Sequence, residues 1–469
     1  MLKHIRLPLI FFGLIVISMT ACGTSSSADR PAAQIDPNVA TTIEPIITPT
    51  PEPTSTPTII PLTMTPSSNF ASGPKKPADV TVCASGCDFK TVQEAIDNPN
   101  TGSGTVIEIF ETVHTEGGIE VSKDVTIRGM GPELTTIQAH PDLKQATKRV
   151  FFIPVDTTVV ISELTIQHGN PQPDKYFRSG GGIANLGTLT VENCVIQRNT
   201  ANDGGGIWSR QGELRVINST IRDNIADRKA IEEDFVIPNY SSTFACGSGG
   251  GIKLVRGGDL YLLNSTINNN IAMSHGGGAF VACSTNATLM NSTISGNQAT
   301  TWGGGIYVKG VVNLSHCTIV NNNAKAVCAS GQQAARCPKG EGGNGVFIRG
   351  IMNFSNSLIL NKGSNDCILG KAGEYGTLED GKIGESLNNF VGDGSCDADY
   401  FGDPMLEPLA DNCGYTETHA ILNGSPLIDA VEEPFCPVAL DQRGYPRGKS
   451  NEESKAFCDI GAFEYQDLK

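Results

Sequence analysis

The chain repeats one short phrase, and this repeat restricts its fold more than any other feature. The phrase consists of Gly-Gly-Gly-Ile, a Leu-x-Val segment and an Asn-(Ser/Cys)-x-Ile-x-x-Asn-x-Ala segment. The third glycine of successive copies falls at residues 182, 206, 251, 278, 305 and, in the degenerate form Gly-Asn-Gly, 345. Three intervals of 24 to 27 residues and two longer ones indicate a single unit with two insertions. Units of this length, built from β-prone segments between glycine and asparagine turns, are typical of a β-solenoid.

Period-two alternation predicts which side chains face the interior of the solenoid, because every second residue of a strand points to the same side. One interior column would be Ile183, Ile207, Ile252, Ala279, Ile306 and Val346. A second would be Leu189/Val191, Leu214/Val216, Leu260/Leu262, Ala287/Leu289, Val312/Leu314 and Met352/Phe354. A single coil cannot bury its apolar side alone, so stacking of the coils builds the core.

A third set of equivalent positions predicts an internal ladder of side chains at one turn. Its members are Asn199, Asn224, Asn270, Asn297 and Asn322. Asparagine tolerates a left-handed backbone, and its amide can bond to the asparagine of the next coil. We therefore expect these asparagines to have a structural role.

The segment before the repeats predicts a strand, a tight Cys83–Cys87 loop and a short amphipathic helix with Val92, Ala95 and Ile96 on one face. The stretch from Phe89 to Ile96 resembles the start of pectin-lyase-like right-handed parallel β-helices, which include pectin methylesterases. We therefore predict an all-β fold, a single-stranded right-handed parallel β-helix with an N-terminal helical cap.

The N-terminal residues are predicted to form a targeting signal followed by a linker. A basic start and an apolar run from Leu7 to Ile17 lead to Cys22. This resembles a bacterial lipoprotein signal, which implies a signal peptide over 1–21, lipidation of Cys22 and anchoring of an exported protein at the bacterial cell surface. An ordinary secretory signal is the alternative. Residues 22–78 are rich in Thr, Pro and Ser, so we expect a disordered stalk.

The remaining chain divides into the β-helix, predicted over 79–364, and a C-terminal region of coils and a disulfide-containing cap, over 365–469. The repeat resembles that of polymorphic outer-membrane proteins, although no C-terminal barrel translocator follows it here. The segments "DNCGYTETHAILNGSPLIDA", "CPVALDQRGYPRG" and "CDIGAFEY" resemble the C-terminal region of choice-of-anchor type Q proteins. These resemblances imply an exported β-helix protein and carry little information about activity.

Cysteine usage is consistent with an oxidising location outside the cell. Cys194 and Cys317 occupy inward positions, where we expect buried free thiols, and Cys413 is left over. Pairs that are close in sequence are the easiest to bridge, and the predicted disulfides are Cys83–Cys87, Cys246–Cys283, Cys328–Cys337, Cys367–Cys396 and Cys436–Cys458. A Cys-x-x-Cys spacing is absent, so we expect no structural zinc and no other metal or cofactor.

The residues that follow the inward isoleucine column should point outward. They are Ala184, Trp208, Lys253, Phe280, Tyr307 and Phe347, with Arg210, Lys309 and Arg349 two positions further along and Trp302 beside them. We call this set the aromatic stripe. Exposed aromatic rings stack on sugars and cations pair with uronic acids, which makes the stripe a candidate track for an acidic glycan. Alternatively, the C-terminal segment or the 227–248 insertion covers it as a secondary core.

Three insertions, at 171–179, 227–248 and 325–341, all fall between Asn-x-Ala and the next glycine run. We expect them to form one rim of the solenoid, because loops at equivalent positions of successive coils share a corner.

Catalytic chemistry has little support in the sequence. The row before the glycine runs contains Ser179, Asp203, Ser248, His275 and Trp302. Its one carboxylate, Asp203, would lie about 10 Å from His275, because coils stack ~4.8 Å apart. Asp441, Arg443 and Asp459 lie in the C-terminal pattern, where we expect a structural role.

These observations favour a monomeric, surface-tethered protein that acts noncatalytically in adhesion or in binding acidic or neutral polysaccharides, with another cell surface as a further possible partner. A polysaccharide lyase or glycoside hydrolase on the same fold is the alternative, and a structural envelope protein is a second one. The formal net charge of −15 argues against nucleic acid as a partner.

Overall fold

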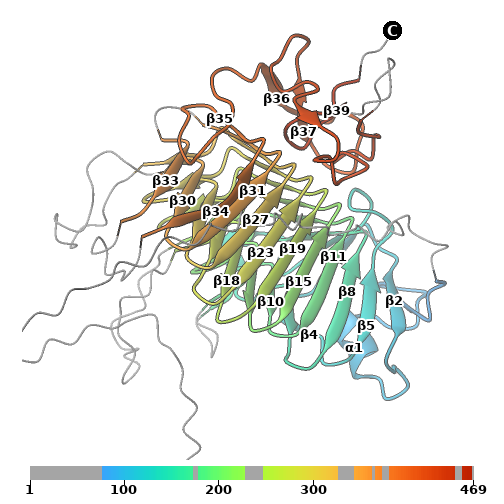
Figure 1. The fold of residues 1–469 in the computed structure, drawn as a ribbon. Coiled ribbons are helices and arrows are strands. Elements are labelled where there is room, and N and C mark those ends of the chain that lie inside the picture. The colour runs from blue at the N-terminus through green and yellow to red at the C-terminus, as the bar shows by residue number, and fades with distance from the viewer. Residues whose placement is uncertain are drawn as a thin grey trace, which may run out of the picture.

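The computed structural model describes residues 76–172, 178–227, 247–325, 343–361, 365–371, 380–448 and 457–466. Within these residues the chain winds into the predicted right-handed parallel β-helix, with α1 at its N-terminal end (Figure 1). The predicted signal peptide, Cys22 and nearly all of the stalk lie outside the described residues. No helix in the described ranges is long and apolar enough to cross a membrane.

Three long parallel sheets, here called A, B and C, form the walls of the solenoid. Sheet A consists of β1 (Val80–Val82), β2 (Thr105–Ile109), β5 (Val125–Arg128), β8 (Thr158–Ser162), β11 (Thr188–Glu192), β15 (Glu213–Ile217), β19 (Asp259–Leu263), β23 (Asn286–Met290), β27 (Val311–Ser315), β31 (Ile351–Ser355) and β34 (Lys382–Leu387). Sheet B consists of β3 (Val113–Thr115), β6 (Thr136–Gln138), β9 (Thr165–Gln167), β12 (Val195–Gln197), β16 (Thr220–Arg222), β20 (Thr266–Asn268), β24 (Thr293–Ser295), β28 (Thr318–Val320), β32 (Leu358–Leu360) and β35 (Phe390–Val391). Sheet C consists of β4 (Ile119–Glu120), β7 (Phe151–Ile153), β10 (Ile183–Asn185), β14 (Ile207–Arg210), β18 (Ile252–Val255), β22 (Ala279–Val281), β26 (Ile306–Val308), β30 (Val346–Ile348) and β33 (Cys367–Leu369).

Shorter elements complete the described chain. A narrow parallel sheet at the corner between sheets B and C consists of β13 (Thr200–Ala201), β17 (Ile225–Ala226), β21 (Ile271–Ala272), β25 (Gln298–Ala299) and β29 (Asn323–Ala324). The helical elements are α1 (Val92–Asp97) and the 3-10 turn η1 (Leu143–Gln145). Two antiparallel pairs follow the solenoid: β36 (Leu406–Ala410) with β37 (Thr418–Ile421), and β38 (Val431–Glu432) with β39 (Phe457–Cys458).

The interior columns are those predicted from the alternation. Ile183 pairs in register with Ile207, and Leu214 pairs with Leu260. The column members are at most 3% exposed and belong to one continuous core cluster. Period-two burial within each coil and the repeat between coils therefore suffice to build the core.

The asparagine ladder is confirmed. The side-chain oxygen of Asn224 accepts hydrogen bonds from the backbone and side-chain amides of Asn199, both at 3.0 Å. The side-chain oxygen of Asn270 accepts the same two hydrogen bonds from Asn224. The left-handed backbone lies one residue earlier than expected, at positions such as Asp223, where φ is 55°. The ladder asparagines are therefore required by their hydrogen bonds to the next coil and not by an unusual φ of their own.

The glycine runs are required by the close approach of adjacent coils. Gly204 has a φ of 59°, which side chains rarely adopt. A Cβ on Gly205 would lie 2.6 Å from the carbonyl oxygen of Gly250 in the next coil. The repeated Gly-Gly-Gly is therefore a packing requirement of the scaffold.

The N-terminal cap has the predicted apolar face. Val92, Ala95 and Ile96 are fully buried, and Thr91 and Glu94 form a capping box at the start of α1. The helix thus covers the open end of the core, which the first coil would otherwise expose to water.

A buried histidine supports this cap from the first coil. The imidazole of His114 lies 2.8 Å from the carboxylates of both Glu111 and Glu116. Glu116 also accepts the backbone amides of Val92 and Gln93 at the start of α1. Burial lowers the pKa of His114, but the hydrogen bonds and charges of the two glutamates outweigh it and leave the pKa raised.

Three predicted disulfides are confirmed: Cys83–Cys87, Cys367–Cys396 and Cys436–Cys458. Cys194 and Cys317 are buried free thiols, as expected, and burial raises the pKa of each to about 12. Cys413 is an exposed free thiol. Cys246, Cys328 and Cys337 lie outside the described residues, so the pairings Cys246–Cys283 and Cys328–Cys337 stay predictions.

Candidate functional site

The aromatic stripe lies on the outer side of sheet C, but the prediction that it forms an exposed track is wrong. Its aromatic members are nearly inaccessible to solvent, with Tyr307 completely buried, and its charged members are buried or half-buried. The buried residues are Trp208, Lys253, Phe280, Trp302, Tyr307, Phe347 and Arg349, and the half-buried ones are Arg210 and Lys309. The alternation placed these side chains outside the main core, where they form secondary apolar clusters.

The stripe is held together by stacking between coils. The ring of Tyr307 stacks on those of Phe280 and Phe347, with centroids 5.1 and 5.6 Å apart. The imidazole of His275 lies 4.8 Å from the Tyr307 ring and 4.7 Å from the Trp302 ring. Contacts of this kind stabilise a fold beyond the area that they bury, so the described contacts of these rings are structural.

The row that precedes the glycine runs is confirmed as a column of stacked residues, and its two titratable members have separate partners. Asp203 accepts from the amide of Ser248 at 3.1 Å and forms an ion pair of 2.7 Å with Lys253. His275 hydrogen-bonds to Thr301. Burial raises the pKa of Asp203, and Lys253 opposes this effect. Nothing in this geometry couples the carboxylate to the imidazole as an acid–base pair.

The described residues that follow the last coil, 403–448 and 457–466, do not cover the stripe, because they pack on sheet B. In Figure 1 its hairpins lie along one edge of the solenoid, at the end of the colour scale. The side chain of Gln442 bonds to Thr266 and Thr293, two outward residues of sheet B, at 2.9 and 2.7 Å. His419 contacts Ser295 on the same face at 2.9 Å. The expectation that the C-terminal segment buries the stripe is therefore wrong for its described part, and most of the 227–248 insertion lies outside the described residues.

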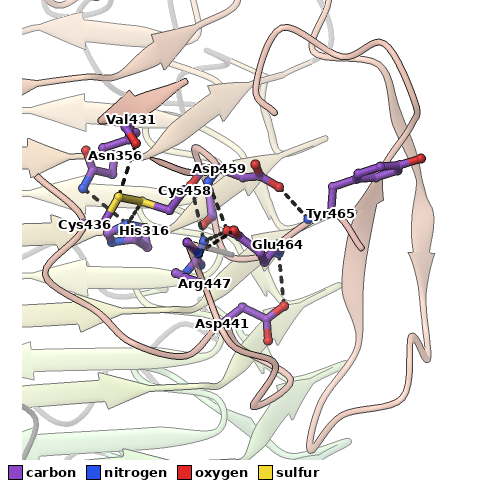
Figure 2. Close-up of polar contacts among 12 residues, drawn as sticks. His316, Asn356, Val431, Cys436, Asp441, Arg447, Cys458, Asp459, Glu464 and Tyr465 are labelled. Carbon is purple, nitrogen blue, oxygen red and sulfur yellow. Dashed lines mark hydrogen bonds and ion pairs between the residues drawn. A yellow bond between two sulfur atoms is a disulfide. The ribbon is translucent and has the colours of Figure 1, made fainter. Parts of the chain in front are cut away.

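Figure 2 shows the buried charged network that closes this region. Arg447 bonds to the carboxylate of Glu464 at 3.0 Å, and the same carboxylate accepts the backbone amide of Asp459. Asp459 in turn accepts the amides of Asp429 and Tyr465. Burial, reinforced by Glu464, raises the pKa of Asp459 to about 7. The carboxylates of Asp459 and Glu464 accept hydrogen bonds from backbone amides, which supports the structural role expected for this sequence pattern.

A disulfide and a buried histidine continue the network toward the solenoid (Figure 2). The Nε2 atom of His316 lies 3.6 Å from the sulfur of Cys458 and 3.3 Å from the side-chain amide of Asn356. Burial lowers the pKa of His316 well below its ordinary value. A neutral imidazole in this position joins the turn between β27 and β28 to the C-terminal disulfide.

The described flanks of the insertions share one corner, as the rim hypothesis requires. Arg178, at the end of the first insertion, bonds to Asn202 at 2.7 Å and lies 3.6 Å from Asp227, where the second insertion begins. The side-chain oxygen of Asn344, after the third, accepts the amide of Ala324. The loops between these flanks, 173–177, 228–246 and 326–342, lie outside the described residues.

The outer face of sheet A is the candidate binding face of the molecule. Its strands form the front of Figure 1, and no described element lies over them. The central outward position of six consecutive strands is in register and at least partly exposed to solvent. We call this set the outer column, and its members are Thr190, Arg215, Tyr261, Thr288, Asn313 and Asn353.

Two members of the outer column form its most distinctive surface. The guanidinium of Arg215 lies 5.1 Å from the centre of the Tyr261 ring. Arg215 also bonds to Glu213, which raises the pKa of the arginine. A partly exposed ring beside fixed polar groups can stack on an apolar ring face while the polar groups bond to hydroxyls.

The surroundings of the outer column are acidic. Glu192, Glu213 and Asp259 point outward from β11, β15 and β19, and Arg215 is the only outward cation of these three described strands. The excess of carboxylates disfavours a polyanionic ligand on this face.

Arg215 and Tyr261 were not among the residues proposed from sequence. The signal was available, because the alternation that places Leu214 and Val216 inward places Arg215 outward. The aromatic stripe was predicted to be the binding face because it holds more aromatic residues. The outward direction of a side chain does not show whether other segments cover that face.

The described residues contain no group of three or more His, Cys, Asp or Glu side chains arranged to hold a metal ion.

A match to a family model agrees with the architecture. A family model described as "Right handed beta helix region" matches residues 154–337. Among solved structures, the pectate lyase Pel9A is similar with a TM-score of 0.40 and 13% identity, over 78% of this chain and 89% of that chain. A ι-carrageenase in complex with ι-carrageenan fragments has a TM-score of 0.27 and 12% identity, over 70% and 88% of the respective chains. No curated protein matches the sequence. At these identities the two structures carry no information about activity.

Proposed function

We propose that this protein binds polysaccharide noncatalytically and that the glycan lies along the outer face of sheet A. The observation that carries the proposal is the in-register outer column, with Tyr261 and Arg215 at its centre. The proposal includes export and tethering through Cys22, which would present this face to an adjacent cell or to a cell-wall polymer.

The spacing of the coils supports a linear ligand that runs along the solenoid axis. Adjacent parallel strands lie about 4.8 Å apart, which is close to the length of one pyranose unit in an extended chain. Successive sugar units would therefore meet equivalent positions of successive coils. Thr288, Asn313 and Asn353 supply hydroxyl and amide groups along this line.

A lyase or hydrolase remains the alternative, and a structural envelope protein is the second. Neither has an observation of its own in its favour. The carboxylates of Asp459 and Glu464 accept backbone amides, and the carboxylate of Asp203 is paired with Lys253. These carboxylates support folding contacts and are not opposed across an open groove.

Retention on immobilised neutral and acidic polysaccharides tests the proposal, with the flow-through analysed for new reducing or unsaturated ends. We expect retention without such products. Tyr261→Ala should weaken retention by up to about tenfold, because one ring contact contributes about 0.5–1.5 kcal/mol. Tyr261→Phe should keep most of the retention.

Phe401→Ala is the matched control, because Phe401 is an exposed aromatic residue outside sheet A. Retention that Tyr261→Ala leaves unchanged in a folded protein would remove the outer column from the proposal. New chain ends would instead establish the enzyme alternative.

A further inference from the structure

A cavity of about 320 Å³ opens on the C-terminal region, away from the core of the solenoid. Residues of three segments line it, among them Asp411, Asn412, Arg443, Tyr445, Phe463 and Gln466. Cavities that bind small molecules range from about 300 to 1,000 Å³. The size of this one therefore suits a single ring and not a polymer segment.

Arg443 is the fixed element of this cavity. Its Nε atom donates to the carboxylate of Asp441 at 2.8 Å, and Nη2 donates to the carbonyl of Glu464 at 2.6 Å. The guanidinium lies 4.5 Å from the centre of the Tyr445 ring and 3.5 Å from that of Phe463. The side chain is 7% exposed, so its position is set before any ligand arrives.

One donor of this arginine is left unused. Among the described residues, Nη1 of Arg443 has no hydrogen-bond or ion-pair partner, and it is accessible to solvent although the side chain as a whole is 7% exposed. A guanidinium donor that reaches solvent bonds to water in the free protein, and a ligand oxygen can replace that water. Because Arg443 lines the cavity, an oxygen bound there can be this acceptor.

The charges around the cavity indicate an uncharged ligand. Asp441 neutralises Arg443, and Asp411 adds a carboxylate at the rim. One oxygen of Asp411 accepts the amide of Cys413 at 3.0 Å, which leaves the second oxygen to accept from a ligand hydroxyl. An anionic ligand would be repelled by this net negative charge.

We propose that this cavity binds one neutral pyranose unit. The ring of Tyr445, which is 38% exposed, would stack on the sugar. Arg443 would donate to a hydroxyl or ring oxygen, and Asp411 would accept from a hydroxyl. This site is separate from the outer column of sheet A and does not depend on the function proposed for that face.

The test is a ligand-observed NMR titration of the full chain with neutral methyl hexopyranosides and with the methyl glycoside of glucuronic acid. We expect saturable binding of at least one neutral glycoside and weaker binding of the glucuronide. Tyr445→Ala should reduce the affinity about tenfold, and Tyr445→Phe should retain it. Phe401→Ala, which changes an aromatic residue with 74% exposure outside the cavity, should have no effect.

A second variant keeps the test decisive if Tyr445→Ala perturbs the fold. Asp411→Asn retains an oxygen for the Cys413 amide but removes the charge at the rim of the cavity. It should therefore lower the affinity for neutral glycosides and reduce the difference in affinity between neutral glycosides and the glucuronide. Absence of binding by every neutral glycoside would overturn the proposal. Equal binding of the glucuronide, or binding that neither variant changes, would do so as well.

Discussion

The asparagine ladder can be tested at Asn270, which lies in the middle of the stack and is fully buried. Its side-chain oxygen accepts both the backbone and the side-chain amide of Asn224 at 3.0 Å. Its side-chain amide donates to Asn297 and to the carbonyl of Ile221 at 3.0 and 2.9 Å. Asn270→Ala removes these four contacts, together with the hydrogen bond from the same amide to the carbonyl of Asn268 at 3.1 Å.

The expected loss of stability follows from the groups left behind. The backbone amide of Asn224 would lose its partner in a buried position, which costs about 1–3 kcal/mol. The side-chain amide of Asn224 keeps the carbonyl of Ile196, so its loss is smaller. With about 1 kcal/mol for the remaining hydrogen bonds, we expect the free energy of unfolding to fall by about 2–4 kcal/mol.

Equilibrium urea unfolding, followed by circular dichroism with the disulfides intact, measures this change. Asn286→Ala is the control, because Asn286 is an exposed asparagine of sheet A, and we expect a change within about 0.5 kcal/mol. A loss below about 0.5 kcal/mol for Asn270→Ala, at an unchanged denaturant dependence, would refute the assignment of the ladder as a stabilising element.

Three further predictions concern titration and thiol reactivity. The folded pKa of His114 is raised by its two glutamates, so its stabilisation is fully present below the unfolded pKa and is lost as the pH rises through the folded value. His114→Gln should therefore lower the unfolding free energy more at pH 5 than at pH 9 in urea titrations. Because the pKa of Asp459 is raised to about 7, the stability of the fold should fall as the pH rises from about 4 to 7. Asp459→Asn should reduce this pH dependence in melting temperatures measured across that range. An unchanged pH dependence would contradict the role of burial. Alkylation of the native protein followed by peptide mass spectrometry should label Cys413 but not Cys194 or Cys317, which should react only after unfolding; early labelling of either buried thiol would contradict the packing.

The architecture was predictable because it depends on local periodicity. The alternation that places Ile183 and Leu214 inward is the same in every coil, so one phrase determines the core of many coils. The apolar face of α1 and three of the disulfides were predictable for a similar reason, since they involve residues close in sequence. The left-handed backbone was predicted at the ladder asparagines but lies one residue earlier. Asparagine is favoured both at a left-handed φ and where its side chain bonds to the next coil, so the residue type alone does not distinguish the two roles.

The open face of the molecule was not predictable in the same way. An outward direction is a local property of a strand, whereas solvent exposure depends on what else lies over that strand. Tyr307 and Tyr261 both point away from the core, yet Tyr307 is completely buried and Tyr261 is partly exposed.

The amino-acid sequence by itself determined the inside of the solenoid, because each coil repeats the same burial pattern and needs only its neighbour to satisfy it. The tertiary structure decided the outside. The C-terminal region docks on sheet B through residues such as Gln442 and Thr266, which are 176 positions apart in the chain. Arg443, Tyr445 and Asp411 meet in one cavity for the same reason, since contacts between distant segments are set by complementary surfaces and leave no periodic signal in the sequence.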